Sequence, residues 1–129
     1  MREIALDTQA ATAVAIIEDG RVIGRAHNDS GRHHAESITP LVREALGDAG
    51  LPSTLADAGI DRVLVGTGPA PFTGLRSGLV SARVLARVAG VPAYGVSALD
   101  VIARQGLDLL APDTRVYAIA DARRRELYW

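Results

Sequence analysis

The sequence of 129 residues contains no cysteine and no lysine. The absence of cysteine excludes disulfides, thiolate nucleophiles and every zinc site that is built on cysteine. All 14 basic residues are arginine, and the absence of lysine excludes a Walker-type phosphate-binding loop, a Schiff-base lysine and a Ser–Lys dyad. Only His27, His33 and His34 remain as imidazole ligands or bases. Much of the common chemistry of enzymes is therefore excluded before any motif is considered.

The chain also has no strong charge of one sign and no long apolar run. Its formal net charge is −1, so composition does not favour binding to nucleic acid or to a membrane surface. The longest unbroken apolar run, 13–17, is far too short to span a bilayer, and the charged first residues do not resemble a signal peptide. Apolar residues make up 48% of the chain, which is typical of a globular protein with one hydrophobic core. We therefore expect a cytoplasmic protein without a membrane partner.

Three short strands are predicted at the N-terminus, over residues 3–8, 12–18 and 21–28. Each segment is rich in Val, Ile and Ala, and the Asp19-Gly20 pair between the second and third is a strong signal for a tight hairpin turn. The pattern therefore predicts an antiparallel meander.

Helices and strands alternate in the rest of the chain. Apolar residues recur at helical spacing over 33–50, and Pro40 either kinks this helix or marks its beginning with Thr39 as N-cap. A buried strand is predicted over 62–66, a helix over 75–89 and a further strand over 93–96. A helix capped by Ser97 follows over 97–103, then a strand over 115–121 and a charged turn over 121–125. The chain then stops within the second strand of a new hairpin, which indicates a fragment of a longer protein.

The helix over 75–89 has an apolar surface too wide for packing on one sheet. Its apolar residues spread over about 260° of the helical wheel, whereas Arg76, Arg83 and Arg87 cluster within about 40°. The apolar surplus predicts that another helix, another domain or another chain covers this helix. The three arginines either pair with acidic groups of a partner, contact RNA phosphates or form a solvated face.

Two segments have the composition of an anion-binding site. Asp7 and Thr8 end the first predicted strand, where a carboxylate and a hydroxyl either face a phosphate or its metal ion, or bond the backbone of the turn. The Gly-rich segment 66–78 leads into a helix, with Thr73 as the predicted cap. It forms either an anion site at a helix N-terminus or a rigid strand-to-helix corner. It matches neither a P-loop nor a dinucleotide fingerprint.

No metal site and no catalytic residue are predicted. His33 and His34 are adjacent, so they point about 100° apart on a helix and rarely hold one ion together. No segment fits the G-x-S-x-G pattern of a hydrolase nucleophile.

The chain resembles the bacterial TsaB (YeaZ) family along essentially its whole length. The segments that carry the resemblance are I-A-L-D-T at 4–8, H-A-E-S-I-T-P-L at 34–41, G-x-G-P-x-x-F-T-G-L-R-x-G at 66–78, Y-G-V-S-A-L-D at 94–100 and D-A-R-R-R-E-L-Y-W at 121–129. Ala70 and Pro71 stand where the family usually has Gly and Ser, which stiffens the loop and removes a hydroxyl.

The resemblance implies an α/β structure of the ASKHA class (actin, sugar kinases and heat-shock proteins), with two ribonuclease H-like halves, each a mixed sheet with flanking helices. Residues 1–111 would form the N-terminal domain, and 112–129 would begin a second, truncated one. The implied function is that of a non-catalytic partner of the transferase TsaD, which makes N6-threonylcarbamoyladenosine at position 37 of tRNA. Like TsaB, the sequence lacks the histidine pair by which TsaD holds its metal. The ATPase TsaE joins the implied assembly, and contact with tRNA is indirect.

The resemblance also assigns residues to two sites. ATP or ADP in the assembled complex is the only cofactor that the resemblance leaves open. Its site would use Asp7, Thr8, Gly68, Thr73 and Gly74. A helical bundle with TsaD, or with a second copy, would use Leu41, Ala45, Val80, Arg83, Val84, Arg87 and Val88.

Three alternative functions stay open. They are an ASKHA-type ATP-dependent phosphotransferase or hydrolase, a metal-dependent glycoprotease with transferase or peptidase homology, and a homodimeric scaffold.

Overall fold

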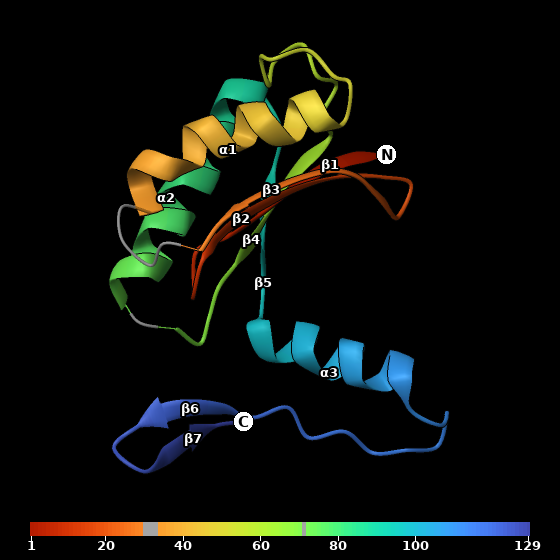
Figure 1. Cartoon of the computed structure of the whole chain (residues 1–129), viewed down its shortest axis with the longest axis vertical. Coiled ribbons are helices and arrows are strands. Elements are labelled where there is room, and N and C mark those ends of the chain that lie inside the picture. The colour runs from red at the N-terminus through yellow and green to blue at the C-terminus, as the bar shows by residue number, and fades with distance from the viewer. Residues whose placement is uncertain (30–33, 71) are drawn as a thin grey trace.

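The computed structural model describes residues 1–29, 34–70 and 72–129, with strands and helices in alternation after an initial meander (Figure 1). Residues 30–33 and 71 are outside this description, and the predictions for His33 and Pro71 therefore fall outside the described residues. The strands are β1 (Arg2–Asp7), β2 (Thr12–Glu18), β3 (Arg21–Asn28), β4 (Arg62–Gly66), β5 (Ala93–Val96), β6 (Ala120–Arg123) and β7 (Glu126–Tyr128). The helices are α1 (His34–Asp48), α2 (Phe72–Ala89) and α3 (Ala98–Leu109).

The first five strands form one mixed sheet in the order β3-β2-β1-β4-β5. The predicted meander is confirmed, because β2 pairs antiparallel with both β1 and β3. Asp19 and Gly20 have φ angles of 48° and 79°, as the tight turn between β2 and β3 requires. Strand β1 is central, and its other neighbour, β4, is parallel to it, with Ile4 opposite Val63.

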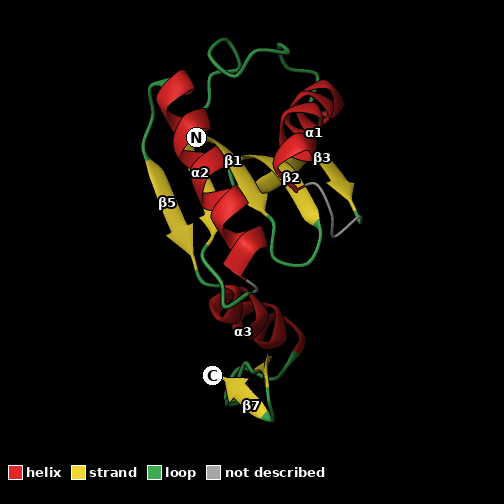
Figure 2. Cartoon of the chain, turned by 90° about the vertical axis from the view of Figure 1, so that its left-hand side faces the viewer, coloured by secondary structure: helices red, strands yellow, loops and turns green. Residues whose placement is uncertain are grey.

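Helices α1 and α2 cover the same face of this sheet (Figures 1 and 2). The core lies between the two layers, and it contains the alternate residues of the strands that point toward the helices. Ile4, Ile16 and Val63 are fully buried there, together with Leu46 from α1. This alternation arises because successive side chains of a strand point to opposite faces.

Helix α2 approaches the sheet through its small residues. The buried positions of this helix are Gly74, Gly78, Ala82 and Ala86, spaced four residues apart. Residues at this spacing form one ridge along a helix. Because the ridge that faces the sheet is small, the backbone of α2 comes close to the strands, and its larger apolar side chains lie on its flanks and on its outer surface.

The second face of the sheet is largely open. Helix α3 lies below it, and no residue of α3 is buried (Figure 1). Beyond α3, β6 and β7 pair with each other in a separate two-stranded sheet. The division of the chain after residue 111 stays a prediction.

Several predicted bounds are corrected by the structure. Residues 115–119 form no strand, because no neighbouring strand pairs with them, and β6 begins only at Ala120. Helix α2 begins at Phe72 rather than at residue 75, so Thr73 lies inside its first turn and does not cap it. Ser97 is the N-cap of α3 by position, but its side chain makes no capping hydrogen bond. Pro40 lies inside α1, which begins before it.

Candidate functional site

The Asp7 carboxylate accepts two hydrogen bonds from Gln9 at the end of β1. Its Oδ1 atom accepts the backbone N–H of Gln9 at 2.8 Å, and its Oδ2 atom accepts the side-chain amide of Gln9 at 2.9 Å. Strand β4 ends beside it at Gly66, where a Cβ atom would lie 2.2 Å from Asp7 Oδ2. Because β1 and β4 are parallel, their carboxyl ends meet at one edge of the sheet, and the absence of a side chain at Gly66 leaves room for the Asp7 carboxylate.

Thr8 connects this edge to α2. Its side chain is 2% exposed, and its hydroxyl donates a hydrogen bond to the backbone carbonyl of Gly74 at 2.7 Å. The glycine one turn further along the helix, Gly78, faces the same hydroxyl, and a Cβ atom there would lie only 2.4 Å from Thr8 Oγ1. The Thr8 hydroxyl therefore fixes the beginning of α2 against the tip of β1.

The loop between β4 and α2 brings the other predicted nucleotide residues to this edge. Gly68 is buried with a φ of +96°, a backbone conformation that favours glycine. The Gly68 carbonyl accepts the N–H of Ala98 at the start of α3 at 2.8 Å. Thr73 is exposed, and its carbonyl accepts the Ser77 hydroxyl at 3.3 Å. Of the five predicted residues, Thr8 and Gly74 are joined directly.

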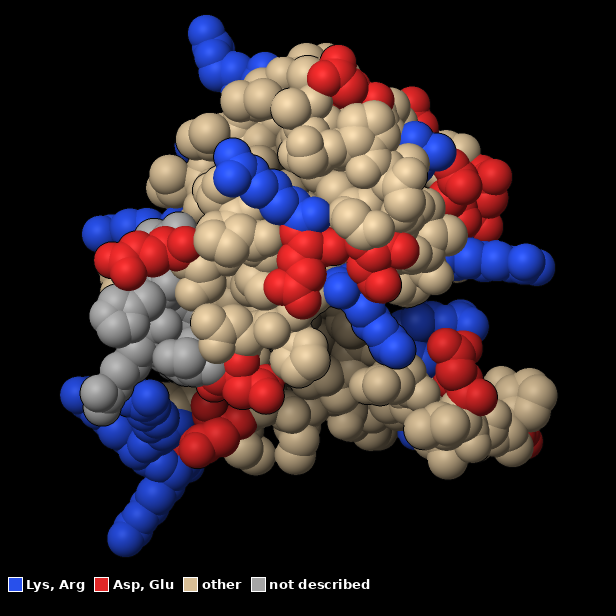
Figure 3. All heavy atoms as spheres, turned by 45° about the horizontal axis from the view of Figure 1, so that its top comes forward, with Lys and Arg blue, Asp and Glu red and all other residues tan. Residues whose placement is uncertain are grey.

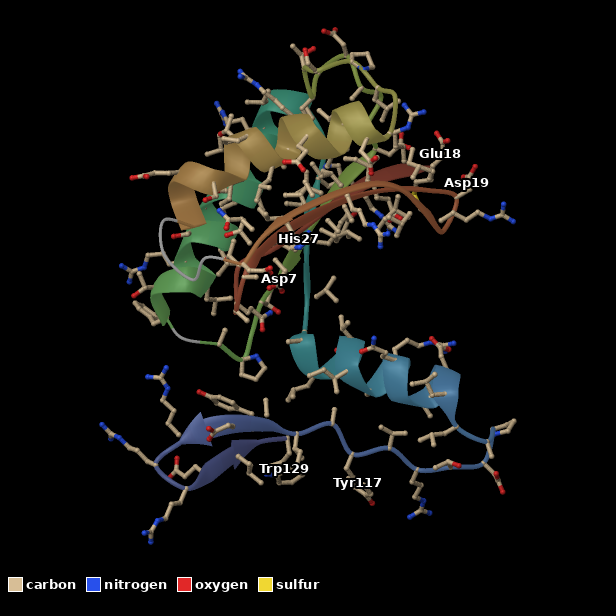
Figure 4. All side chains as sticks on the ribbon, viewed as in Figure 1. Asp7, Glu18, Asp19, His27, Tyr117 and Trp129 are labelled. Atoms are coloured by element: carbon tan, nitrogen blue, oxygen red, sulfur yellow. The ribbon has the colours of Figure 1, made fainter. Side chains whose placement is uncertain are left out.

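A cavity of about 590 Å³ opens between the uncovered face of the sheet and the first turns of α3. Its walls are mainly apolar, with Ala5, Ala15 and Leu64 from the sheet and Ile102 from α3. Four polar side chains also line it, namely Asp7, Gln9, Arg25 and His27. Asp7 and His27 are labelled in Figure 4, where both lie near the end of the sheet from which α3 departs.

Titratable groups do not converge on a metal site in the part of the chain that the structure describes. No group of three or more His, Asp or Glu side chains there could hold an ion. His27 has its Nε2 atom 3.9 Å from the Asp29 carboxylate, and both side chains are exposed.

The outer surface of α2 carries a row of valines. Val80, Val84 and Val88 are 56%, 56% and 60% exposed, and they follow one another at four-residue spacing on the side opposite the small ridge. Arg83 and Arg87 are exposed beside them. The apolar surplus that the sequence predicts for this helix is therefore present at its surface. We call the surface of these five residues the outer face of α2.

Leu41 and Ala45 have a different place. Both residues belong to α1, are 5% and 0% exposed, and pack in the core on the inner side of that helix. They therefore belong to the hydrophobic core and do not line the outer face of α2.

Two features of α2 are not predicted from the sequence. Phe72 is 71% exposed, and the Arg76 guanidinium lies 4.3 Å from the centre of its ring. The small ridge that begins at Gly74 is the second feature, and its signal is the spacing of Gly and Ala at every fourth residue.

In the part of the chain that the structure describes, no helix combines the length and the apolar character that crossing a bilayer would need.

Sequence comparison identifies relatives over nearly the whole chain. The family model described as TsaD, tRNA N6-adenosine threonylcarbamoyltransferase, matches residues 24–129. An uncharacterized protein of Mycobacterium tuberculosis is 45% identical over 98% of this chain and 56% of its own length. The tRNA threonylcarbamoyladenosine biosynthesis protein TsaB of Escherichia coli is 40% identical over 100% of this chain and 54% of its own length. The chain thus spans about half the length of these two relatives.

Solved structures agree on the fold. YeaZ from Pseudomonas aeruginosa is 34% identical and superposes with a TM-score of 0.80 over 99% of this chain and 58% of its own. Two more distant structures share the fold alone. A ROK hexokinase from Thermus thermophilus has a TM-score of 0.54, 15% identity and coverage of 83% of this chain and 38% of its own. RuvC of the same organism has a TM-score of 0.52, 17% identity and coverage of 84% and 69%. The predicted ribonuclease H-like, ASKHA fold class is confirmed. The chain belongs to the family that the TsaD model describes and, within it, to the TsaB (YeaZ) group.

Proposed function

We propose that this chain is a non-catalytic component of an assembly that makes N6-threonylcarbamoyladenosine in tRNA. In this role it binds a TsaD-type transferase through the outer face of α2. Two findings support the proposal: the names of its relatives, and the row of exposed valines on a helix whose opposite side already packs on the sheet.

The exposed valine row is the observation that carries the proposal. Val80, Val84 and Val88 form an i, i+4 ridge, and such a ridge packs into the groove of a facing helix. Contiguous exposed apolar side chains on a protein of this size mark an interaction surface. The occupant is therefore expected to be an amphipathic helix.

Charge restricts the partner further. Helix α2 contains three arginines and no acidic residue, and none of these arginines forms an ion pair with a described residue. A partner helix that places carboxylates beside the valine row would pair with Arg83 and Arg87. Complementary charge of this kind accelerates association and excludes wrong partners more than it adds affinity.

Light scattering behind gel filtration tests the proposal. The chain is measured alone and mixed with the TsaD of the same organism. Val84→Glu places a charge in the centre of the outer face of α2 and should abolish the mixed complex. Val22→Glu is the matched control, because Val22 is 60% exposed, close to the 56% of Val84, but lies on β3. It should leave the complex intact. A chain that ignores TsaD, or a complex that Val84→Glu leaves unchanged, contradicts the proposal.

A homodimeric scaffold is the second candidate, and the surface of α1 favours it. Glu36 and Glu44 are exposed on α1, which packs beside α2. In a twofold dimer, the arginines of one α2 would meet the carboxylates of the other copy's α1. A dimer of the chain alone that persists when TsaD is added would support the scaffold over the accessory subunit.

The predicted nucleotide site is part of the proposal. Asp7, Thr8, Gly68, Thr73 and Gly74 lie at the carboxyl edge of the sheet and at the start of α2, and they would take ATP or ADP only in the assembled complex. TsaE would join the same assembly. Isothermal titration of ADP into the chain, with and without TsaD, measures this directly.

A further inference from the structure

Arginines without a carboxylate partner gather at the tip of the β6–β7 hairpin. Arg123, Arg124 and Arg125 are all exposed, and none of them forms an ion pair with any residue that the structure describes. Figure 3 shows basic side chains projecting together from the lower left of the molecule. Because the net charge of the whole chain is −1, this positive tip is a local feature and not part of a basic surface.

The backbone of this tip is unusual for arginine. Arg123 pairs with Glu126, which leaves Arg124 and Arg125 as a two-residue turn. The φ angles of Arg123, Arg124 and Arg125 are 63°, 53° and 64°, in the left-handed region where Asn and Gly are favoured in such turns. The Asp121 carboxylate accepts the backbone N–H of Arg123 at 2.7 Å, so it stabilises the turn. Turn geometry does not account for the arginines, which suggests that their side chains are needed.

The first turn of α2 adds an aromatic ring and a fourth arginine. Figures 1 and 2 place this turn and the hairpin tip on the same side of the molecule. Phe72 is exposed with the Arg76 guanidinium stacked on its ring, and Arg76 also has no carboxylate partner among the described residues. Basic side chains with an exposed aromatic ring form the kind of surface that binds unpaired nucleic acid, since arginines meet phosphates and rings stack on bases.

We propose that Arg76 and Arg123–Arg125, with Phe72, bind the phosphate backbone of an unpaired stretch of RNA. This inference rests on the proposed function, in which the RNA is tRNA. The guanidinium group presents a planar fork of donors that matches the oxygens of a phosphate. The surface is separate from the valine row, which lies further along α2, so that one chain could contact the transferase and the RNA together.

The hairpin offers a variant that removes charge without harming the turn. Arg124→Asn combined with Arg125→Gly creates the sequence that this turn favours, so the hairpin is retained. Binding is measured by fluorescence anisotropy with an unmodified tRNA transcript, at several salt concentrations, for the chain alone and with TsaD. We expect at least a roughly 10-fold loss of affinity at low salt, and a decrease of about 1.4–1.8 in the slope of log K against log salt, since two phosphate contacts are lost.

Two further variants make the result specific. Arg21→Gln with Arg104→Gln removes the same charge from exposed sites elsewhere and should change the affinity by less than about 2-fold, since their contribution is only long-range and screened. Arg124→Lys with Arg125→Lys keeps the charge, so it should leave the slope of log K against log salt unchanged, while part of the affinity is lost with the guanidinium fork.

Four results would overturn the proposal. The first is an unchanged tRNA affinity in the Asn-Gly variant. The second is an equal loss in the Arg21 and Arg104 control. The third is loss of TsaD binding with tRNA binding intact, which would assign the tip to an acidic protein surface. Competition by ATP at micromolar concentration would assign it to a mononucleotide and would overturn the proposal as well. Failure of the proposed function is distinguishable, because it appears as a missing TsaD complex whether or not the tip binds tRNA.

Discussion

The contact between α2 and Thr8 allows a prediction with a magnitude. In Gly78→Ala, the new methyl group would lie 2.4 Å from Thr8 Oγ1, well inside contact distance. Thr8 is buried and its hydroxyl is bonded to the Gly74 carbonyl, so it cannot rotate away without breaking that bond. Overpacking costs about 1–3 kcal/mol, and the disturbed hydrogen bond costs about 1 kcal/mol. Removing a helical glycine returns about 1 kcal/mol. The free energy of unfolding should therefore fall by about 1–3 kcal/mol.

Urea denaturation followed by far-ultraviolet circular dichroism measures this change. Gly47→Ala is the matched control, because Gly47 lies in α1 with no atom within 4 Å of a Cβ atom built there. It should gain about 0.5–1 kcal/mol from helix propensity alone. In the double variant Thr8→Ala with Gly78→Ala the hydroxyl is absent, so the loss should be smaller than the sum of the two single losses. If Gly78→Ala is as stable as Gly47→Ala, helix α2 does not pack on the sheet through its small ridge.

Two further predictions concern α1 and the N-terminus. Pro40→Ala should raise the free energy of unfolding by about 1–3 kcal/mol, since it restores a backbone donor inside α1; a lower melting temperature would show instead that Pro40 stabilises the beginning of this helix. The Met1 ammonium donates a hydrogen bond to Asp19 Oδ1 at 2.5 Å. This hydrogen bond, assisted by the charge attraction, raises the pKa of the amine and lowers the pKa of the Asp19 carboxyl. The small stabilisation from the amine is complete below its unfolded pKa of 8.0 and is lost as the pH rises through the higher folded value. The stabilisation from Asp19 is present above its unfolded pKa of 3.8 and is lost as the pH falls through the lower folded value. Asp19→Asn should remove both dependences, and an NMR titration in which the Asp19 carboxyl titrates at 3.8 would show that the pair does not form in solution.

The elements with local signals could be predicted from the sequence. The bounds of β2, β3, β4 and β5 agree with the predicted ranges, because apolar β-branched residues end at turn residues such as the Asp19-Gly20 pair. The order of strands and helices is confirmed for the same reason. Each of these signals lies within a few residues of the element that it predicts.

The elements that depend on distant contacts could not be predicted. The segment 115–119 has the composition of a strand, but a strand needs a neighbour, and only residues from Ala120 on have one. The sequence predicts the start of α2 at residue 75, because the preceding Gly and Pro residues are typical of a loop, whereas the helix begins at Phe72. Leu41 and Ala45 are predicted for the helical bundle with a partner, and the structure places their side chains on the buried side of α1, a side that the helical spacing alone cannot assign.

The same distinction between local signals and distant contacts applies to the candidate site. The sequence places Asp7, Thr8 and the Gly-rich segment at the ends of strands, and the structure brings them to one edge. The packing of Thr8 against Gly74 and Gly78 could not be foreseen, because it joins residues that are far apart in the chain. Glycines that suggested room for a phosphate also make room for a helix to approach a sheet.

The position of β1 in the middle of the sheet has a consequence for folding during synthesis. Glu3 is opposite Ile17 on one side and opposite Arg62 on the other. The meander needs only the first 28 residues, so it can form early, whereas the parallel neighbour must wait until α1 and the following loop have left the ribosome. Until then β1 has a free edge, and free edges pair with other chains. Variants that weaken the pairing of β4 should therefore reduce the yield of folded protein in cells more than they reduce the stability of the purified chain.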